Sequence, residues 1–403
     1  MSLAQLWQQS GDQLSDKRVQ QIIAIAGDGK LRDGNATSLE FREFLSQVSS
    51  DVLHRYAEEC LKESFTDSGL VLQDIINQVG RRLGFAVTDG RYQGVRGENG
   101  FDGLWRFPDG HCVVVEVKTT DAYRIDSDKI AGYRKRLIAG NEINEEQSSI
   151  LIVVGRNDTG DLEAQIRGSR HAWDIRLISV DALARLMLLK ESVDDPRIIG
   201  RICNILIPRE FTRLDEIIEI VFFTTEEAKQ PISFDDEEET EEEVASLSEN
   251  QVAISPVAFQ ETCIERFGRY HEIKLIKRFR AGFSTSDESF AVICAVSKTY
   301  NRGNQKSFWF TFRPYHKDFL GNCSRGFLLL GCGSIDFVLA VSYNEVLSWL
   351  NDLWTTGLED KMYWHIRIRF EQNEFFLERK NDKGRLNVTQ FLLPADSVTK
   401  KQF

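Results

Sequence analysis

The sequence predicts an α/β domain with a mixed central sheet flanked by helices, followed by a separate α+β domain. Helical and extended patterns alternate between about residues 61 and 205, as they do in α/β domains. Residues 112–117 are almost entirely apolar, which is typical of a central strand. An acidic run at residues 235–249 then divides the chain, whose 403 residues suffice for two or three domains.

The elements of the α/β domain follow from apolar spacing and from turn residues. Apolar side chains recur every three or four residues from Leu72 to Leu83, which predicts a helix that ends at Gly84. Later signals predict, in order, an extended stretch from 85, a helix from 126, strands at 149–154 and 176–180, and a helix over 180–190.

A hairpin turn is predicted between the strand that carries Asp102 and the apolar strand at 112–117. We expect a three-residue loop over 109–111, with its glycine at the positive-φ position. This register pairs Leu104 with Glu116 and Asp102 with Lys118. A loop of two residues would instead place Asp102 on the opposite face of the sheet.

Two charged side chains interrupt the otherwise apolar strand. Glu116 and Lys118 are two residues apart, so they share one face of the strand. Burying charges is costly unless they pair with each other or bind something. Carboxylates beside a lysine form a group that can hold Mg²⁺ against a phosphodiester. The alternative is a plain ion pair between Glu116 and Lys118.

Asp102, the Glu116-x-Lys118 triplet and the order of elements resemble the PD-(D/E)xK nuclease superfamily, in its Mrr-type branch. The resemblance covers about residues 60–205 and implies a restriction-endonuclease-like core. It implies that Asp102 and Glu116 ligate Mg²⁺, for which Mn²⁺ can substitute, with the carbonyl of Val115 or Val117 as a backbone ligand. Lys118 would orient or activate the attacking water.

The first helix departs from this family pattern. Mrr-type relatives usually carry a glutamate there, and counting back from Gly84 puts Gln73 at that position. Gln73 could orient the attacking water through its amide, but it adds no charge. Asp74 lies next to it and could replace the missing carboxylate if the helix is rotated slightly. The number of carboxylates, two or three, stays open at this stage.

The rest of the chain divides into three further regions. Residues 1–60 are helical by pattern, either as a cap on the nuclease domain (61–225) or as a dimerisation element. Residues 226–252 form an acidic segment, with nine acidic side chains and no basic one between 235 and 249. The formal net charge of the whole chain is −12, so much of it comes from this segment. Like charges repel, so we expect a disordered linker, either a simple spacer or a strip that mimics DNA.

Residues 253–403 predict an α+β recognition or regulatory domain rich in aromatic strands. Between Phe259 and Arg325 it holds twelve Lys/Arg and six Asp/Glu. Basic clusters make salt-dependent phosphate contacts, and neighbouring aromatic rings can stack on bases. For Trp309, Phe310 and Trp364 taken singly, a place in the core is the preferred interpretation. The expected nucleic-acid contacts are Arg278, Arg280, Arg302 and Lys306.

Several classes of protein are disfavoured. No apolar run is long enough for a membrane span, and residues 1–5 show no secretory signal. The seven cysteines form no CxxC pair, which disfavours zinc and suits a reducing cytoplasm. No complete phosphate-binding loop of the GxxxxGK[ST] type occurs.

The sequence therefore predicts a cytoplasmic, Mg²⁺-dependent endonuclease that hydrolyses DNA, in bacterial restriction or phage defence. A homodimer is expected because cutting both strands needs two sites. RNA stays open as a substrate, since the motif does not report the sugar. The rivals are a catalytically silent nucleic-acid-binding scaffold, and an effector whose C-terminal domain releases the nuclease when a ligand or protein activator binds.

Overall fold

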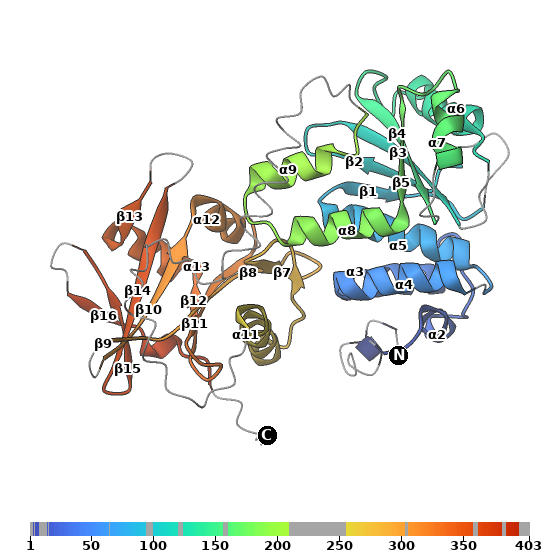
Figure 1. Ribbon diagram of the computed structural model, residues 1–403. Helices are drawn as coiled ribbons and strands as arrows, with labels where there is room; N and C mark the ends of the chain where they lie inside the picture. The colour runs from blue at the N-terminus through green and yellow to red at the C-terminus, as the bar shows by residue number, and fades with distance from the viewer. Residues whose placement is uncertain are drawn as a thin grey trace. The chain divides into compact units, whose positions relative to one another are not determined.

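The computed structural model shows two compact units, Met1–Thr224 and Thr225–Phe403, which we describe separately (Figure 1). The acidic segment at 226–252 lies outside the described residues. The structure describes residues 3, 5–7, 14, 16–63, 65–93, 100–119, 124–155, 160–208, 255–302, 305–357, 362–380 and 384–394, without the side chains of 301 and 302.

The first unit is built on a five-stranded mixed sheet in the order β1-β2-β3-β4-β5. The pairs β1–β2 and β2–β3 are antiparallel, whereas the pairs β3–β4 and β4–β5 are parallel. The strands are β1 (Ala86–Asp89), β2 (Gly103–Arg106), β3 (Cys112–Lys118), β4 (Ser148–Val154) and β5 (Ile175–Ser179). The helices are α2 (Val19–Ile25), α3 (Ala36–Gln47), α4 (Ser50–Lys62), α5 (Ser68–Leu83), α6 (Ser127–Ala139), α7 (Gly160–Arg167), α8 (Val180–Glu191) and α9 (Pro196–Asn204).

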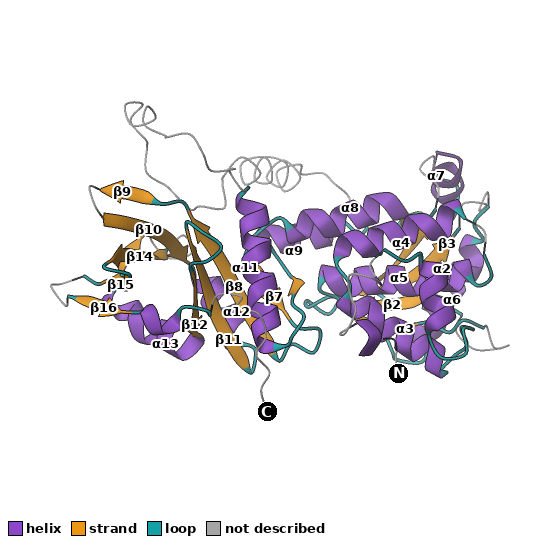
Figure 2. Cartoon of the chain, turned by 90° about the horizontal axis from the view of Figure 1, so that it is seen from below, coloured by secondary structure: helices purple, strands orange, loops and turns teal. Residues whose placement is uncertain are grey.

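Helices cover both faces of this sheet (Figure 1), and in the view from below helices lie in front of the strands (Figure 2). Val113 and Val115 of β3 point into an apolar core that they share with α5 and α8. Val114, one residue along the strand, points into a second core with α6 and α7. Alternation of side chains along the strand therefore produces the layers, and the expected mixed sheet between helices is confirmed.

The N-terminal helices belong to the same core as the sheet. Phe41 and Phe44 of α3 and Tyr56 of α4 are fully buried in one cluster with Leu72 of α5. The region 1–60 is helical in its described part, as expected. Its shared core favours the cap over the separate dimerisation element.

The predicted ends of two helices are confirmed. Gly84 ends α5 at φ 99°, a left-handed conformation that glycine adopts without strain. Asp126 caps α6 by accepting a hydrogen bond from the backbone N–H of Lys129. These two ends fix where α5 and α6 stand against β3.

The hairpin between β2 and β3 has the predicted loop length but a different register. Phe107 and His111 close the loop, so its three residues are 108–110, with the glycine at φ 91°. Leu104 therefore pairs with Val114 and not with Glu116, which corrects the expected pairing. The shift is two residues. It keeps Asp102 on the face of Glu116 and Lys118 and moves it next to Glu116.

The second unit combines two sheets, a six-stranded one and a five-stranded one. The first has the order β16-β15-β14-β10-β9, with β13 also paired to β14; the second has the order β12-β11-β8-β7-β6. Its strands are β6 (Ile276–Lys277), β7 (Gly282–Ser284), β8 (Phe290–Ser297), β9 (Tyr300–Arg302), β10 (Gln305–Phe312), β11 (Arg325–Cys332), β12 (Val338–Ser342), β13 (Trp354–Thr356), β14 (Tyr363–Glu371), β15 (Glu374–Glu378) and β16 (Arg385–Asn387).

In the described residues of this unit, three α-helices accompany the sheets: α11 (Pro256–His271), α12 (Pro314–Gly321) and α13 (Tyr343–Trp349). Cys263 and Phe267 of α11 are fully buried against β8 and β11. In the described parts of the chain, no helix has both the length and the apolar composition that a membrane span requires.

Candidate active site

Asp102, Glu116 and Lys118 lie together where β2 begins and β3 ends. The Oδ2 atom of Asp102 accepts a hydrogen bond of 2.6 Å from the backbone N–H of Val117. Glu116 and Lys118 flank that residue on β3, and their Oε1 and Nζ atoms are 2.5 Å apart. The three predicted side chains therefore form one group on the face of the sheet that carries α6.

Four hydrogen bonds hold the backbone of Asp102, which lies where β2 begins. Its N–H donates to the carbonyl of Val115 at 3.0 Å. Its own carbonyl accepts three hydrogen bonds, from Gly90 N–H, Gln73 Nε2 and Asn77 Nδ2, at 3.0, 3.2 and 2.9 Å. Side chains of α5 thus reach past the edge of the apolar core to fix the start of β2.

Close packing at this point requires glycine. A Cβ atom added to Gly90 would lie 2.0 Å from the carbonyl oxygen of Phe101. A Cβ at Gly103 would lie 2.2 Å from Oδ1 of Asn77. Real Cβ atoms do not approach oxygen this closely, so the backbone can come together around Asp102 only because both side chains are missing.

Burial and charge repulsion dominate the electrostatics of Asp102. Burial of the carboxyl, followed by repulsion from Glu116, raises its pKa to about 7. The hydrogen bond from Val117 and the charges of Lys118 and Lys129 act in the opposite direction without cancelling the shift. Two carboxylates in a half-buried site thus repel each other, and a bound cation would relieve this repulsion.

Lys118 remains an ammonium ion in this environment. Burial acts to lower its pKa, but attraction by Glu116 and then by Asp102 outweighs burial, so the pKa is raised. Its side chain is 34% exposed, whereas the side chain of Glu116 is 7% exposed. The lysine therefore lies at the solvent side of the group, with the glutamate behind it.

The residues present fit a divalent cation. Oε2 of Glu116 is buried and has no hydrogen-bond partner among the described residues. Such an atom loses its solvation without compensation unless a ligand supplies it. Asp102, Glu116 and the backbone carbonyl of Val117 offer oxygen ligands, which Mg²⁺ and Mn²⁺ prefer.

Asp74 does not belong to this group, which corrects the expectation that it adds a metal ligand. Its carboxylate is 1% exposed and accepts hydrogen bonds from Nε of Arg42, at 2.9 Å, and from the Tyr92 hydroxyl. Burial raises its pKa to about 6, although Arg42 and Tyr92 counteract this. Neighbouring residues on a helix point about 100° apart, so Gln73 and Asp74 cannot face the same site.

Gln73 does reach the site but uses its amide on the protein itself. Its Nε2 donates to the carbonyl of Asp102, so the residue positions β2. Asn77, one helical turn further on, makes the same contact and also accepts a hydrogen bond from Trp105 Nε1 at 3.0 Å. The four-residue spacing from Gln73 to Asn77 was a signal for this second contact.

Helix α6 adds two residues that the sequence analysis did not assign to the site. Tyr133 contributes to the electrostatic environment of Lys118, and Lys129 to that of Asp102. Tyr133 is 7% exposed, and its hydroxyl lies 3.1 Å from the position that a Cβ atom on Gly100 would occupy. The apolar helix face that includes Tyr133 is visible in the sequence, but its orientation over β3 is not.

A second group of possible metal ligands occurs in the first unit. Ligand atoms of His54 and Glu58 on α4 and Asp181 on α8 lie within 4.8 Å of one another. Glu58 is also bonded to Lys62 at 2.8 Å, and Asp181 to Arg185 at 3.0 Å. These lysine and arginine side chains already neutralise the carboxylates, so the group is a surface ion-pair cluster.

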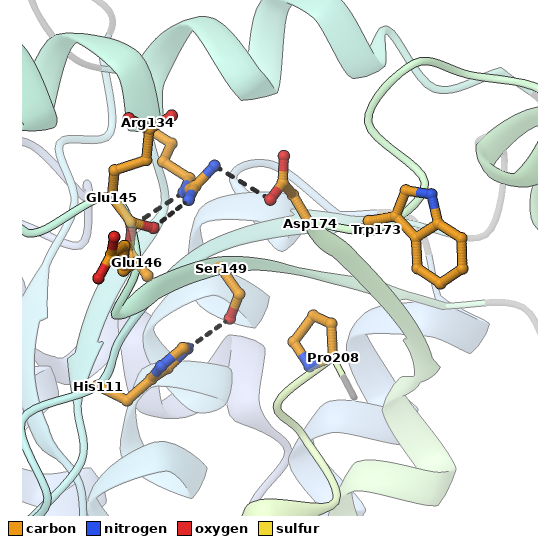
Figure 3. Close-up of a pocket in the computed structure, with 9 residues that line it drawn as sticks. His111, Arg134, Glu145, Glu146, Ser149, Trp173, Asp174 and Pro208 are labelled. Atoms are coloured by element: carbon orange, nitrogen blue, oxygen red, sulfur yellow. Dashed lines mark hydrogen bonds and ion pairs between the residues drawn. The ribbon is translucent and has the colours of Figure 1, made fainter. Parts of the chain in front are cut away.

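A cavity of about 330 Å³ lies at the other end of the strands (Figure 3). Its lining includes Glu145, Glu146 and Asp174, together with the guanidinium of Arg134, which lies 3.3 Å from Asp174. Residues that begin β4 or precede β5 line it, whereas Glu116 and Lys118 end β3. The excess of carboxylates makes it a poor site for a polyanion.

The expected nucleic-acid contacts of the second unit are only partly presented to solvent. Arg280 is 8% exposed, so it cannot serve as a surface phosphate contact, and this expectation is wrong. Arg278 is half-buried and donates to Ser284 Oγ and to the carbonyl of Thr285. Lys306 is exposed and stays a prediction, and the side chain of Arg302 lies outside the described residues.

The chain matches no protein-family model and no curated protein.

Proposed function

We propose that this protein is a metal-dependent nuclease. Its active site, formed by Asp102, Glu116 and Lys118, would hydrolyse phosphodiester bonds. One observation carries the proposal: two adjacent strands bring two mutually repelling carboxylates and one ammonium group into a half-buried cluster. A fold gains no stability from such repulsion. Groups with shifted pKa values of this kind concentrate at functional sites.

The topology is consistent with a restriction-endonuclease-like core of the PD-(D/E)xK type. The carboxylate strands β2 and β3 form an antiparallel pair, β3 continues into a parallel sheet, and helices cover both faces. The sequence resemblance over about 60–205 supports the same assignment. The proposal therefore extends to this fold.

The chain's own residues would perform distinct tasks. Asp102 and Glu116 would hold Mg²⁺, or Mn²⁺ in its place, with the Val117 carbonyl as a further ligand. A bound divalent cation supplies Lewis-acid polarisation of the phosphate and lowers the pKa of water. Lys118 is protonated, so it would donate hydrogen bonds to the attacking oxygen and stabilise the negative charge that develops on the phosphoryl oxygens.

The remaining expectations form part of this proposal. DNA is the substrate we favour, in restriction or phage defence in a bacterial cytoplasm, and RNA is the second substrate to test. A homodimer would place two sites on a duplex. The second unit would recognise nucleic acid or an activator.

A catalytically silent, nucleic-acid-binding scaffold is the competing function. The 2.5 Å ion pair between Lys118 and Glu116 favours it, because this pair already satisfies one oxygen of the glutamate. The free Oε2 atom of Glu116 and the raised pKa of Asp102 favour the nuclease. We therefore keep the nuclease as the conclusion.

Cleavage of supercoiled plasmid and of single-stranded RNA tests the function. The wild type should cut one of them with Mg²⁺ or Mn²⁺ and not with EDTA. Lys118→Ala should remove the activity, whereas Lys62→Ala, which changes an exposed lysine of another ion pair, should retain it. Cleavage that persists in Lys118→Ala would refute the assignment.

A further inference from the structure

The six-stranded sheet of the second unit has two unlike faces. Phe308 and Phe310 of β10 and Ile366 and Ile368 of β14 are at most 2% exposed and belong to the interior. Trp309, between the two phenylalanines, is half-buried on the opposite face. The expectation that Trp309 belongs to the core is wrong, because alternation along β10 turns it to the outer face.

Aromatic rings and one guanidinium group cluster on that outer face. Trp309 lies directly opposite Arg367 in the ladder between β10 and β14. The guanidinium of Arg367 lies over the ring of Trp309 and over that of Trp354 on β13, 5.0 and 5.1 Å from the two centroids. The three strands lie side by side in Figure 1.

Hydrogen bonds fix the orientation of these rings. Nε1 of Trp309 donates to Nδ1 of His365 at 2.9 Å. Nε2 of the same histidine is 2.6 Å from the hydroxyl of Thr356 on β13. Tyr300 on β9 pairs with Ser307, so it continues the same face across the next strand. Aromatic groups therefore extend over four neighbouring strands. We call Tyr300, Trp309, Trp354 and Arg367 the aromatic face.

Positive charge accompanies the rings. Lys298 Nζ lies 5.1 Å from the centroid of Tyr300. Nε of Arg367 is buried and has no hydrogen-bond partner among the described residues. Glu371 and Glu378 lie on the same sheet face and both contact Arg369, at 3.5 and 2.5 Å. Lys298 and Arg367 are the cations that lie over the rings, whereas these two carboxylates are paired with a third cation, Arg369.

We propose that the aromatic face binds the unpaired bases of a single-stranded nucleic acid. Every base has a π-face, so rings and a guanidinium plane on neighbouring strands can stack successive bases without reading their sequence. The adjacent cations attract the phosphates. This inference rests on the part of the proposed function that assigns nucleic-acid recognition to the second unit, and it can fail while the metal site of the first unit stands, because it needs no metal.

Binding of short fluorescein-labelled strands to the full chain in EDTA tests the proposal without cleavage. DNA and RNA strands of one sequence, and the matching DNA duplex, serve as separate probes. Trp309→Ala and Trp354→Ala should each weaken single-strand binding about ten-fold. Trp309→Phe should retain most of it. Trp173→Ala is the matched control, because this tryptophan is 76% exposed in the first unit. The Trp173→Ala variant should bind the single strands as tightly as the wild type does.

Photo-crosslinking with a 5-iodouracil strand provides a measurement on the unaltered protein. The crosslinks should map to peptides that contain Tyr300, Trp309 or Trp354. The proposal is overturned if the wild type binds neither single strand, if Trp309→Ala binds them as tightly as the wild type, or if all crosslinks lie outside these peptides. A loss of duplex binding in Trp309→Ala as large as its loss of single-strand binding would also overturn it, because paired bases cannot stack on the rings.

Discussion

Val117 donates its backbone N–H to the Asp102 carboxylate, so the strand that carries Glu116 and Lys118 also orients the carboxylate of its neighbour. This hydrogen bond to a side chain takes the place of a backbone hydrogen bond between β2 and β3 at the start of β2. Asp102 is therefore fixed at both its backbone and its side chain, which is the kind of preorganisation that a metal site needs.

Asp102→Asn should stabilise the metal-free protein at pH 8. The amide keeps an oxygen that can accept from Val117 but removes the repulsion with Glu116. The folded-state pKa of about 7 lies above the ordinary value of 3.8, so this carboxyl makes the fold less stable as pH rises from about 4 to about 7. We expect a gain of about 1 kcal/mol in the free energy of unfolding in EDTA.

Urea unfolding of both proteins at pH 8 and at pH 4 measures this gain. The difference should shrink toward zero near pH 4, where the carboxyl is protonated in the folded protein and about half protonated in the unfolded one. Equal stability of the two proteins at pH 8 would mean that the predicted repulsion does not exist.

Metal affinity should also depend on pH. Since Asp102 takes up a proton with a pKa of about 7, Mn²⁺ binding should weaken as pH falls below that value. A calorimetric titration between pH 6 and pH 8 measures the change. An affinity that is independent of pH over this range would place Asp102 outside the site.

Asn77→Ala should damage both stability and metal binding. The variant leaves Nε1 of Trp105, a fully buried side chain, without its acceptor, and it removes one of three donors to the Asp102 carbonyl. We expect a loss of about 2 kcal/mol in the free energy of unfolding. Gln73→Ala is the matched control, because it removes only the longer contact, and its effect on both quantities should be smaller.

Asp74→Ala should destabilise the protein without changing metal affinity. The substitution leaves the guanidinium of Arg42, whose side chain is 22% exposed, without its main partner, at a cost of about 3 kcal/mol. Comparison of Mn²⁺ titrations for the two folded proteins separates the effects. Lost Mn²⁺ binding would restore Asp74 to the metal ligands.

Gly90→Ala should be among the most damaging small substitutions in the first unit. Its Cβ would meet backbone atoms of Phe101 and Asp102, so β1 or β2 must shift, and we expect a cost of about 3 kcal/mol. Gly200→Ala, in helix α9 with open space around the added atom, should be neutral or stabilising. Thermal unfolding of the two variants checks the contrast.

The sequence was sufficient to predict the layers of the first unit and the membership of the central group. Side-chain alternation depends only on parity, so a register error of two residues in the β2–β3 hairpin left Asp102 on the correct face. The pairing itself depends on which residues close the turn, and Phe107 and His111 do so through backbone hydrogen bonds that composition does not reveal.

The rotation of each helix about its own axis could not be predicted from the sequence. The sequence could not decide between Gln73 and Asp74, because the rotation of α5 about its axis determines which of the two faces the site, and packing against α3 and β2 sets that rotation. The same applies to Tyr133 on α6. In the second unit, Trp309 and Phe310 looked alike as apolar residues of one strand, and only the packing of the sheet shows which of them is buried.

Mn²⁺ binding to the full-length protein at pH 8 tests the central claim most directly, because it needs neither a substrate nor an activator. The wild type should bind Mn²⁺ in competition with Mg²⁺. Asp102→Asn and Glu116→Gln should each abolish binding, and Asp74→Asn and His54→Ala should not. Binding that survives in both Asp102→Asn and Glu116→Gln, or that is lost in His54→Ala alone, would contradict the account.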